Sequence, residues 1–267
     1  MTTDRDWEKW GSEDPYFGVS SFDRFKRQNL TEQARKEFFK TGEEHVSMIL
    51  ETVRKVFDSE FVPERILDFG CGVGRLLIPF ARTKCHVVGV DVSSSMLREA
   101  QANLERYEIR DVELVRPDDM TSTDDGQFDL VHSFLVLQHI PWNRGKRLID
   151  ELLRHVRPGG YIAVQFYHRC NAPRTVRTLV RLRYAFKAVN WTRNLLRGRP
   201  LAEPAMQLHI YDVSLIMRSL RLAGFTDAYQ LLSTQGNGEF ESTILLARRK
   251  GDAQRTAPVD TVAGISS

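Results

Sequence analysis

Short apolar runs that alternate with helix-type patterns from Pro63 onward constrain the fold of this chain more than any other feature. The runs predict strands over residues 65–69, 86–90, 112–115, 128–134 and 161–166, with helices over 75–82, 94–107 and 145–156. Strands joined by helices run parallel and are covered on both faces, which explains why these runs are apolar throughout. The pattern therefore predicts a doubly wound α/β sheet.

The last part of the chain predicts a reversal of strand direction. A helix is expected over 212–223, and two further strands over 228–233 and 242–248. The link between these strands is short and contains Gly236-Asn237-Gly238, so it has no room for a crossover helix. We therefore expect a mostly parallel, seven-stranded sheet with an antiparallel last strand.

The start of the chain predicts helices after an irregular segment. Residues 7–27 are polar with scattered aromatics and indicate irregular structure or short turns. A helix is expected over 46–57, with Gly42 separating it from an earlier helix over 32–40. The later helix is indicated by apolar residues at the spacing of one buried face, namely Val46, Ile49, Leu50, Val53 and Phe57.

These patterns divide the chain into parts. Residues 1–60 are expected to form an N-terminal helical cap, and residues 61–250 the main domain with a helical insertion over 169–207. The tail over 251–267 lacks periodicity and is expected to be disordered. The helical cap is expected to form one wall of a pocket, with its aromatic residues serving mainly in packing: Tyr16, Phe17, Phe38 and Phe39.

Composition limits the cellular setting. The 267-residue chain has a formal net charge of +3, too small to require nucleic acid as a partner. Its three cysteines, Cys71, Cys85 and Cys170, are few and widely spaced, which favours a reducing cytosol over a disulfide framework. The polar N-terminus does not resemble a signal peptide, and no apolar run reaches the roughly 20 residues of a membrane span. We therefore expect a soluble cytoplasmic protein.

The first predicted strand runs into a glycine turn, Gly70-Cys71-Gly72-Val73-Gly74. Glycine permits a sharp turn and lets a ligand approach where a Cβ atom would collide. Ligands of open α/β sheets bind beyond the carboxyl ends of the strands. Asp91 ends the next strand, where a carboxylate can accept hydrogen bonds from both hydroxyls of a ribose. Together these features predict a site for a nucleotide-type ligand.

Two other interpretations of this turn stay open. A dinucleotide site has a third glycine where this chain has Arg75, and its pyrophosphate disfavours the nearby carboxylate of Asp68. A cationic ligand suits Asp68 better. The glycines are also compatible with a turn that binds no ligand.

Four motifs, in order, resemble the class I S-adenosylmethionine-dependent methyltransferases, and the resemblance covers about Glu64 to Arg248. The Asp-x-Gly-x-Gly-x-Gly signature is Asp68 to Gly74, and the ribose-binding acid is Asp91. The acid and apolar residue after the third strand are Asp119-Met120, and the fourth-strand region is 128–141. The resemblance implies a Rossmann-like fold and S-adenosyl-L-methionine as the cofactor.

The resemblance also implies a cofactor site. Asp68, Gly70 and Gly72 are expected to line the methionine part of the cofactor, and Asp91 to bind the ribose. The full implied set is Asp68, Gly70, Cys71, Gly72, Asp91, Val92, Met96, Asp119, Met120, Ser133 and Phe134.

Further roles within that set are assigned in the same way. Met96 is expected to pack on the adenine, and Asp119 to accept a hydrogen bond from its amino group. The backbone around Ser133 and Phe134 is expected near the sulfonium. Arg75 departs from the neutral residues often found at its place, and we interpret it as a residue on the helix surface or as a partner for a nearby acidic group.

Three histidines are candidate catalytic residues. A hydroxyl acceptor usually needs a base, and the ordinary pKa of histidine lies near neutral pH. His139 follows the fourth strand, His168 ends the fifth, and His209 closes the insertion. Each also fits a packing or capping role. His132, inside the fourth strand, is expected to be a core residue.

The insertion carries a concentrated positive charge. It contains nine basic residues between Arg169 and Arg199 and no acidic one. As a hypothesis, it forms a mobile lid that binds an anionic acceptor through arginine side chains. A solvated helix face, and docking on an anionic membrane or nucleic acid, are the alternatives.

The favoured function is methylation of a small molecule, at a hydroxyl of a sugar or natural-product scaffold. N-methylation of a small-molecule or peptide amine, and cofactor binding without catalysis, are the alternatives. The nucleic-acid amine signature Asn-Pro-Pro-Tyr is replaced by Leu137-Gln138-His139-Ile140. Asp118, Asp124 and Asp125 lack the fuller carboxylate cluster of a metal site, so no metal is expected.

Overall fold

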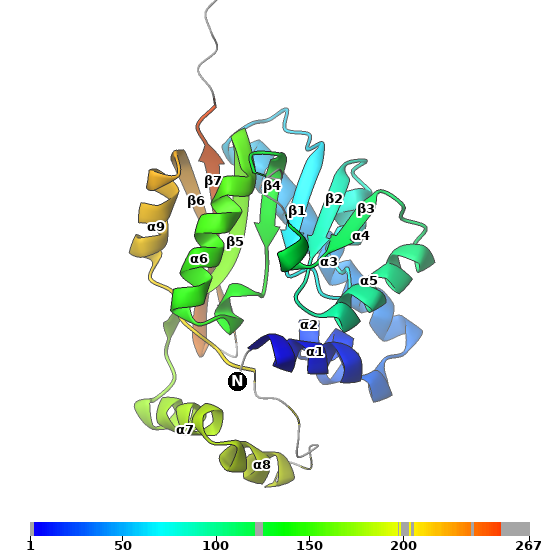
Figure 1. Cartoon of the computed structure of the whole chain (residues 1–267), viewed down its shortest axis with the longest axis vertical. Helices are drawn as coiled ribbons and strands as arrows, with labels where there is room; N and C mark the ends of the chain where they lie inside the picture. The colour runs from blue at the N-terminus through cyan, green and yellow to red at the C-terminus, as the bar shows by residue number, and fades with distance from the viewer. Residues whose placement is uncertain are drawn as a thin grey trace, which may run out of the picture.

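The computed structural model describes residues 3–120, 125–196, 198, 203, 206–235 and 238–251. The tail that was expected to be disordered therefore lies outside the described residues, apart from Gly251. Figure 1 shows a central twisted sheet with helices on both faces.

Seven strands form one sheet in the order β3-β2-β1-β4-β5-β7-β6. Their bounds are β1 (Arg65–Phe69), β2 (His86–Val90), β3 (Val112–Val115), β4 (Phe128–Ser133), β5 (Val156–Cys170), β6 (Phe225–Gln235) and β7 (Phe240–Arg249). All pairs from β3 to β5 are parallel, and β7 is antiparallel to both β5 and β6. The predicted doubly wound sheet with a reversed last strand is confirmed.

The helices cover two apolar cores, one on each face of the sheet. Their bounds are α1 (Thr3–Glu13), α2 (Pro15–Val19), α3 (Glu32–Val56), α4 (Leu77–Ala81), α5 (Ser94–Arg106), α6 (Trp142–His155), α7 (Arg174–Ala185), α8 (Lys187–Leu196) and α9 (Val213–Leu222). Short 3₁₀ turns lie at Asp23–Phe25, Arg27–Asn29, Pro117–Asp119 and Leu137–His139. Among the described helices, none combines the length and apolar character needed to cross a bilayer.

The prediction of irregular structure or short turns over 7–27 was wrong for its first part, which includes most of α1 and all of α2, whereas short 3₁₀ turns follow from Asp23. Trp10, Tyr16 and Phe17 are buried against the rest of the molecule. Short helices gain most of their stability from such packing, and their own periodicity is too brief to reveal them. The expected packing role of Tyr16, Phe17 and the aromatic residues of α3 is confirmed.

The expected break at Gly42 was also wrong, since α3 is continuous from Glu32 to Val56. Gly42 is buried, and a Cβ atom there would overlap the backbone carbonyl oxygen of Arg75. The glycine therefore permits close approach of two backbones and does not end the helix.

We expect Gly42→Ala to lower the free energy of unfolding by about 1–3 kcal/mol, because the overlap outweighs the better helix propensity of alanine. Chemical denaturation of both proteins measures the change. Lys40→Ala, at an exposed position of the same helix, is the matched control and is expected to stay within about 0.5 kcal/mol of the parent. A Gly42→Ala protein more stable than the parent would contradict this account.

One other helix was misplaced by a smaller amount. The helix expected over 75–82 begins only at Leu77, after a series of turns. The helical insertion expected over 169–207 contains two described helices, α7 and α8, which are separated at Phe186.

Candidate functional site

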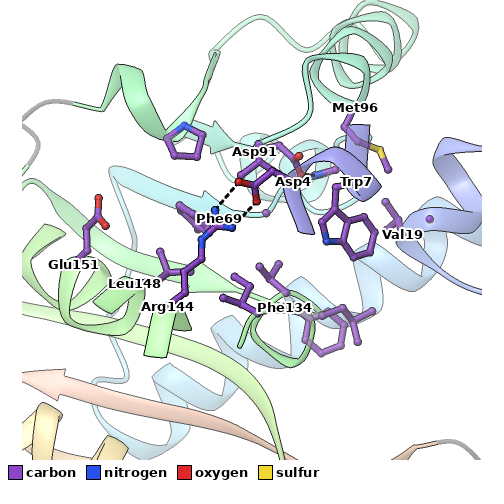
Figure 2. A pocket seen from close by; sticks show the side chains of 18 of the residues that line it. Asp4, Trp7, Val19, Phe69, Asp91, Met96, Phe134, Arg144, Leu148 and Glu151 are labelled. Atoms are coloured by element: carbon purple, nitrogen blue, oxygen red, sulfur yellow. Dashed lines mark hydrogen bonds and ion pairs between the residues drawn. The ribbon is translucent and has the colours of Figure 1, made fainter. Parts of the chain in front are cut away.

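A cavity of about 420 Å³ lies at the carboxyl edge of the sheet, where β1, β2 and β4 end, and α1 covers it (Figure 2). This volume falls within the range of small-molecule sites. The lining residues are Asp4, Trp7, Gly18, Val19, Phe69, Gly70, Gly72, Asp91, Val92, Met96, Pro117, Phe134, Leu135, Val136, Ile140, Arg144, Arg147, Leu148 and Glu151.

The glycine turn forms the floor of this cavity. Gly70 and Gly72 have φ values of 80° and 54°, in the left-handed region that favours glycine. A Cβ atom on Gly70 would overlap the side chain of Val136, and one on Gly72 would lie 2.6 Å from Cγ2 of Val19. The turn is therefore fixed both by its own backbone geometry and by side chains that close around it.

Asp91 joins the ends of β1 and β2. Its Oδ2 accepts a hydrogen bond from the backbone N–H of Gly72 at 2.9 Å, and its Oδ1 accepts from that of Ser93 at 2.8 Å. Burial raises the pKa of Asp91 to about 6, although these two hydrogen bonds oppose the shift. Each oxygen retains acceptor capacity, so the carboxylate can still bind a pair of ligand hydroxyls.

Asp68 lies beneath the turn in a buried polar chain. The strand register sets it opposite His132, and its Oδ1 lies 2.7 Å from Nδ1 of that histidine. The Nε2 atoms of His132 and His45 are 2.9 Å apart. The other oxygen of Asp68 is buried without a hydrogen-bond partner among the described residues.

Both ring nitrogens of His132 have a partner in this chain. Nδ1 faces Oδ1 of Asp68, and Nε2 faces Nε2 of His45. Burial lowers the pKa of His45 to about 2, helped by the nearby His132 and Arg75. His45 is therefore neutral, and its contact with His132 extends the chain that begins at Asp68 to a second ring.

Arg75 is a buried residue, 6% exposed, and its interpretation as a surface residue was wrong. Its guanidinium donates to Thr41 at 3.1 Å and lies 5.7 Å from the ring centre of Phe134. Burial lowers its pKa to about 10, while the charge of Asp68 opposes that change. The second interpretation, a partner for a nearby acidic group, agrees with this electrostatic pairing.

The expected cofactor residues separate into two groups. Those that line the cavity are Gly70, Gly72, Asp91, Val92, Met96 and Phe134, and those absent from its lining are Asp68, Cys71, Asp119, Met120 and Ser133. Cys71 is buried within the turn, and burial raises the pKa of its thiol. Ser133 is buried and donates to the carbonyl oxygen of Phe69 at 2.9 Å. Asp119 is exposed, and nearby Pro117 contributes to the lining instead.

Two of the three candidate catalytic histidines lie near each other. His139 packs against Trp7, with ring centres 4.9 Å apart, and Trp7 lines the cavity whereas His139 does not. Burial lowers the pKa of His139 to about 4, and His209 contributes to that shift. His168 lies elsewhere, with Nε2 3.7 Å from Glu241 of β7. The expected core position of His132 is confirmed at 1% exposure.

Sequence reasoning missed the wall contributed by α6. Arg144, Arg147, Leu148 and Glu151 all line the cavity, and their spacing places them on one face of the helix. Arg144 forms a bidentate ion pair with Asp4 of α1, at 2.7 and 3.0 Å, drawn as dashed lines in Figure 2. The spacing of these α6 residues can be read from the sequence, but the pairing of Arg144 with Asp4 of α1 cannot.

No group of three or more potential metal ligands occurs within the described part of the chain. Asp124, one of the three aspartates considered for a metal, lies outside it.

Comparison with known proteins gives a family match for the part of the chain that holds the glycine turn. Residues 66–160, which contain the glycine turn and Asp91, match the family model described as a methyltransferase domain. Residues 66–160 thus form a methyltransferase domain. The match agrees with the predicted class I family and its cofactor S-adenosyl-L-methionine, and the predicted Rossmann-like fold is confirmed.

Curated relatives of the methyltransferase domain align over part of their length. A ubiquinone biosynthesis O-methyltransferase of Thiobacillus denitrificans is 31% identical over 125 residues, covering 46% of this chain and 53% of the relative. A trans-aconitate 2-methyltransferase of Deinococcus radiodurans is 36% identical over 114 residues, covering 39% of this chain and 40% of the relative. The chain thus spans about half the length of these relatives or less.

Solved structures resemble this chain in fold over more residues than the 66–160 that the family model matches. Magnesium protoporphyrin IX methyltransferase from Synechocystis PCC 6803, with bound SAH, has a TM-score of 0.57 and 21% identity, covering 89% of this chain and 98% of that one. A Burkholderia thailandensis 1,6-didemethyltoxoflavin-N1-methyltransferase has a TM-score of 0.51 and 14% identity, covering 80% and 78%. At these identities the likeness concerns the fold alone.

Proposed function

We propose that this protein transfers a methyl group from S-adenosyl-L-methionine to a small-molecule acceptor, with a hydroxyl of a sugar or natural-product scaffold as the preferred acceptor. The observation that carries the proposal is the cavity bounded by the glycine turn and by the buried carboxylate of Asp91. The O-methyltransferases among the relatives agree with a hydroxyl acceptor. The three free cysteines agree with a cytoplasmic setting.

The residues present suit this cofactor. Gly70 and Gly72 line the cavity with backbone atoms, which lets a ligand come close to the main chain. Asp91 retains acceptor capacity for ribose hydroxyls. The unpartnered oxygen of Asp68 is a suitable acceptor for an ammonium group. When bound, the cofactor supplies an electrophilic methyl group on a positively charged sulfur.

The protein contributes orientation and exclusion of water. Trp7 of α1 and Phe134 after β4 are apolar walls of the cavity, labelled in Figure 2. Holding the acceptor and the methyl donor in line can lower the activation barrier of such a reaction by up to about 7–11 kcal/mol. Anchoring of α1 by the Asp4–Arg144 ion pair therefore serves the reaction by keeping the cavity closed.

We assign the base that a hydroxyl acceptor needs to His139. Its Nδ1 lies 2.8 Å from the carbonyl oxygen of Gln207, so this nitrogen carries the proton and Nε2 accepts. With a pKa of about 4, the ring is neutral at physiological pH, as a base must be before it accepts a proton, although burial makes it a weaker base than an exposed histidine. Because His139 contacts the lining residue Trp7 but does not itself line the cavity, the transfer requires a shift of the Trp7 ring or a bridging water.

We expect His139→Ala to slow methyl transfer to a hydroxyl acceptor about 10²-fold. This is the low end of the range for loss of a general base, because His139 does not itself line the cavity. Labelled cofactor and a panel of hydroxylated sugars and natural products measure the rate. Binding of S-adenosylhomocysteine is expected to stay unchanged, as it is in the surface control His86→Ala. Transfer to no acceptor of any class would refute the enzymatic proposal.

The same panel tests the alternative of N-methylation. A neutral amine attacks without a base, so an N-methyltransferase would tolerate His139→Ala. Its rate would instead level off above the pKa of the acceptor amine. That pair of results would replace the hydroxyl acceptor with an amine.

A further inference from the structure

The two helices of the insertion form an arm that stands apart from the domain. Figure 1 shows α7 and α8 clear of the sheet, on the same side of the molecule as α1. Their main packing contact is with each other. None of the residues that line the cavity comes from the described part of this arm. The described residues of the arm therefore do not contact a ligand in the cavity, and we consider a role for the arm outside it.

Helix α8 has large apolar residues exposed to solvent on one side, and polar residues bonded to the returning segment of the insertion on the other. Three large residues on one half of the helix, Trp191, Leu195 and Leu196, are 51%, 67% and 81% exposed. On the other half, the side-chain amides of Asn190 and Asn194 donate to the backbone carbonyl of Glu203, in the returning chain. Asn194 is fully buried. This arrangement is the reverse of an ordinary surface helix, whose apolar face is turned to the core.

The apolar surface continues onto the neighbouring helix and the turn between them. Phe186, between the helices, is 58% exposed, and Val176 and Leu182 of α7 are each 41% exposed. With Val189 of α8 at 40%, seven large apolar residues are exposed within 21 positions. So many large exposed apolar residues in one short segment are unusual for a monomeric protein, and they indicate an interaction site. We call this set the apolar surface of the arm: Val176, Leu182, Phe186, Val189, Trp191, Leu195 and Leu196.

The charge of the arm selects among partners. The sequences of α7 and α8 hold six basic residues and no acidic one. A second copy of the chain would bring two such segments together, and like charges at an interface are costly. An anionic lipid surface satisfies both features, because basic residues are attracted to its headgroups while tryptophan, phenylalanine and leucine enter the interfacial region.

We infer that the α7–α8 arm docks this protein on an anionic lipid bilayer, with the apolar surface of the arm inserted at the headgroup level. Docking would turn the side of the molecule that bears α1 and the covered cavity toward the membrane. The inference is independent of which acceptor is methylated, and it requires no membrane-spanning segment.

Sedimentation of the full chain with lipid vesicles tests the inference. Vesicles of phosphatidylcholine alone are compared with vesicles that contain about 30 mol% phosphatidylglycerol. We expect binding to the anionic vesicles only, weakened by added salt. The double variant Leu195→Ser, Leu196→Ser is expected to bind at least about tenfold more weakly. The matched control, Leu222→Ser with Leu232→Ser, removes two leucines that are 79% and 72% exposed away from the arm, and it is expected to bind like the parent.

Tryptophan fluorescence gives a second readout that needs no destabilising change. The emission of Trp191 is expected to shift to shorter wavelength on anionic vesicles, and Trp191→Phe is expected to abolish the shift. Equal binding to both vesicle types, no binding to either, or unchanged binding of the Leu195 and Leu196 variant would overturn the inference. A concentration-dependent dimer that the same variant abolishes would assign the surface to a second copy instead.

Discussion

Asp91→Ala is expected to weaken binding of S-adenosylhomocysteine by about 10³-fold. The carboxylate accepts hydrogen bonds from two ligand hydroxyls in the proposed complex, and hydrogen bonds to charged groups contribute about 1.5–3 kcal/mol each. Loss of Asp91 also removes the acceptor of the Gly72 and Ser93 N–H groups, which loosens the turn itself. Isothermal titration calorimetry of parent and variant measures the effect.

The pH dependence of the same binding gives a second, independent test. In the ligand-free protein, burial raises the pKa of Asp91 to about 6 from its ordinary value of 3.8. The ligand hydroxyls donate to the ionised form, so the affinity is highest above pH 6 and falls as the pH drops through that value. Binding near pH 6 is therefore expected to release protons, which titrations in buffers of different ionisation enthalpy detect.

Two variants serve as controls for this prediction. Asp91→Asn keeps the shape of the side chain but not its charge, so its weak binding is expected to lose the pH dependence near 6. Asp111→Asn removes an exposed acid that pairs with His86, and it is expected to bind like the parent. Tight binding to Asp91→Ala, or affinity independent of pH between 5 and 7 in the parent, would refute the role of Asp91.

His132→Leu is expected to lower the free energy of unfolding by about 3–5 kcal/mol, because it leaves the buried carboxyl of Asp68 without its donor. It also removes the hydrogen-bond partner of Nε2 of His45. Both Asp68 and His132 are 1% exposed, so water cannot replace the lost bonds. Urea denaturation followed by circular dichroism measures the change through the transition midpoint and slope.

A paired substitution separates the loss of hydrogen bonding from the loss of volume. Adding Asp68→Asn to His132→Leu makes the stranded side chain neutral, and we expect recovery of part of the stability. His86→Leu, at a partly exposed histidine of β2, is expected to change stability by no more than about 0.5 kcal/mol. A His132→Leu protein as stable as His86→Leu would mean that the Asp68–His132–His45 chain contributes little.

The fold was predictable from the sequence where local patterns were sufficient. The strands expected over 65–69, 86–90 and 112–115 have those bounds in the structure, because each is a short apolar run bounded by turn residues. The reversed last strand followed from a link too short for a helix. The helices of residues 3–19 were not predicted, because they are stabilised by the packing of Trp10, Tyr16 and Phe17. That packing depends on residues far along the chain.

The candidate site was predictable in position but not in its contacts. Chain direction alone brings Gly70, Gly72 and Asp91 to one edge of a parallel sheet, and all three line the cavity. Asp68 was expected in that lining but is buried and bonded to His132. The sequence gives no sign of His45, which completes that chain from α3, 87 residues before His132.

The sequence by itself determined the parallel sheet, its reversed end, the glycine turn and the acid that follows the second strand, because these depend on periodicity and backbone preferences within a few residues. Only the tertiary structure decided which side chains enter the cavity, the burial of Arg75, the wall contributed by α1 and α6, and the outward apolar face of α8. Those features arise from contacts between segments distant in the chain, and such contacts are set by packing of the whole molecule.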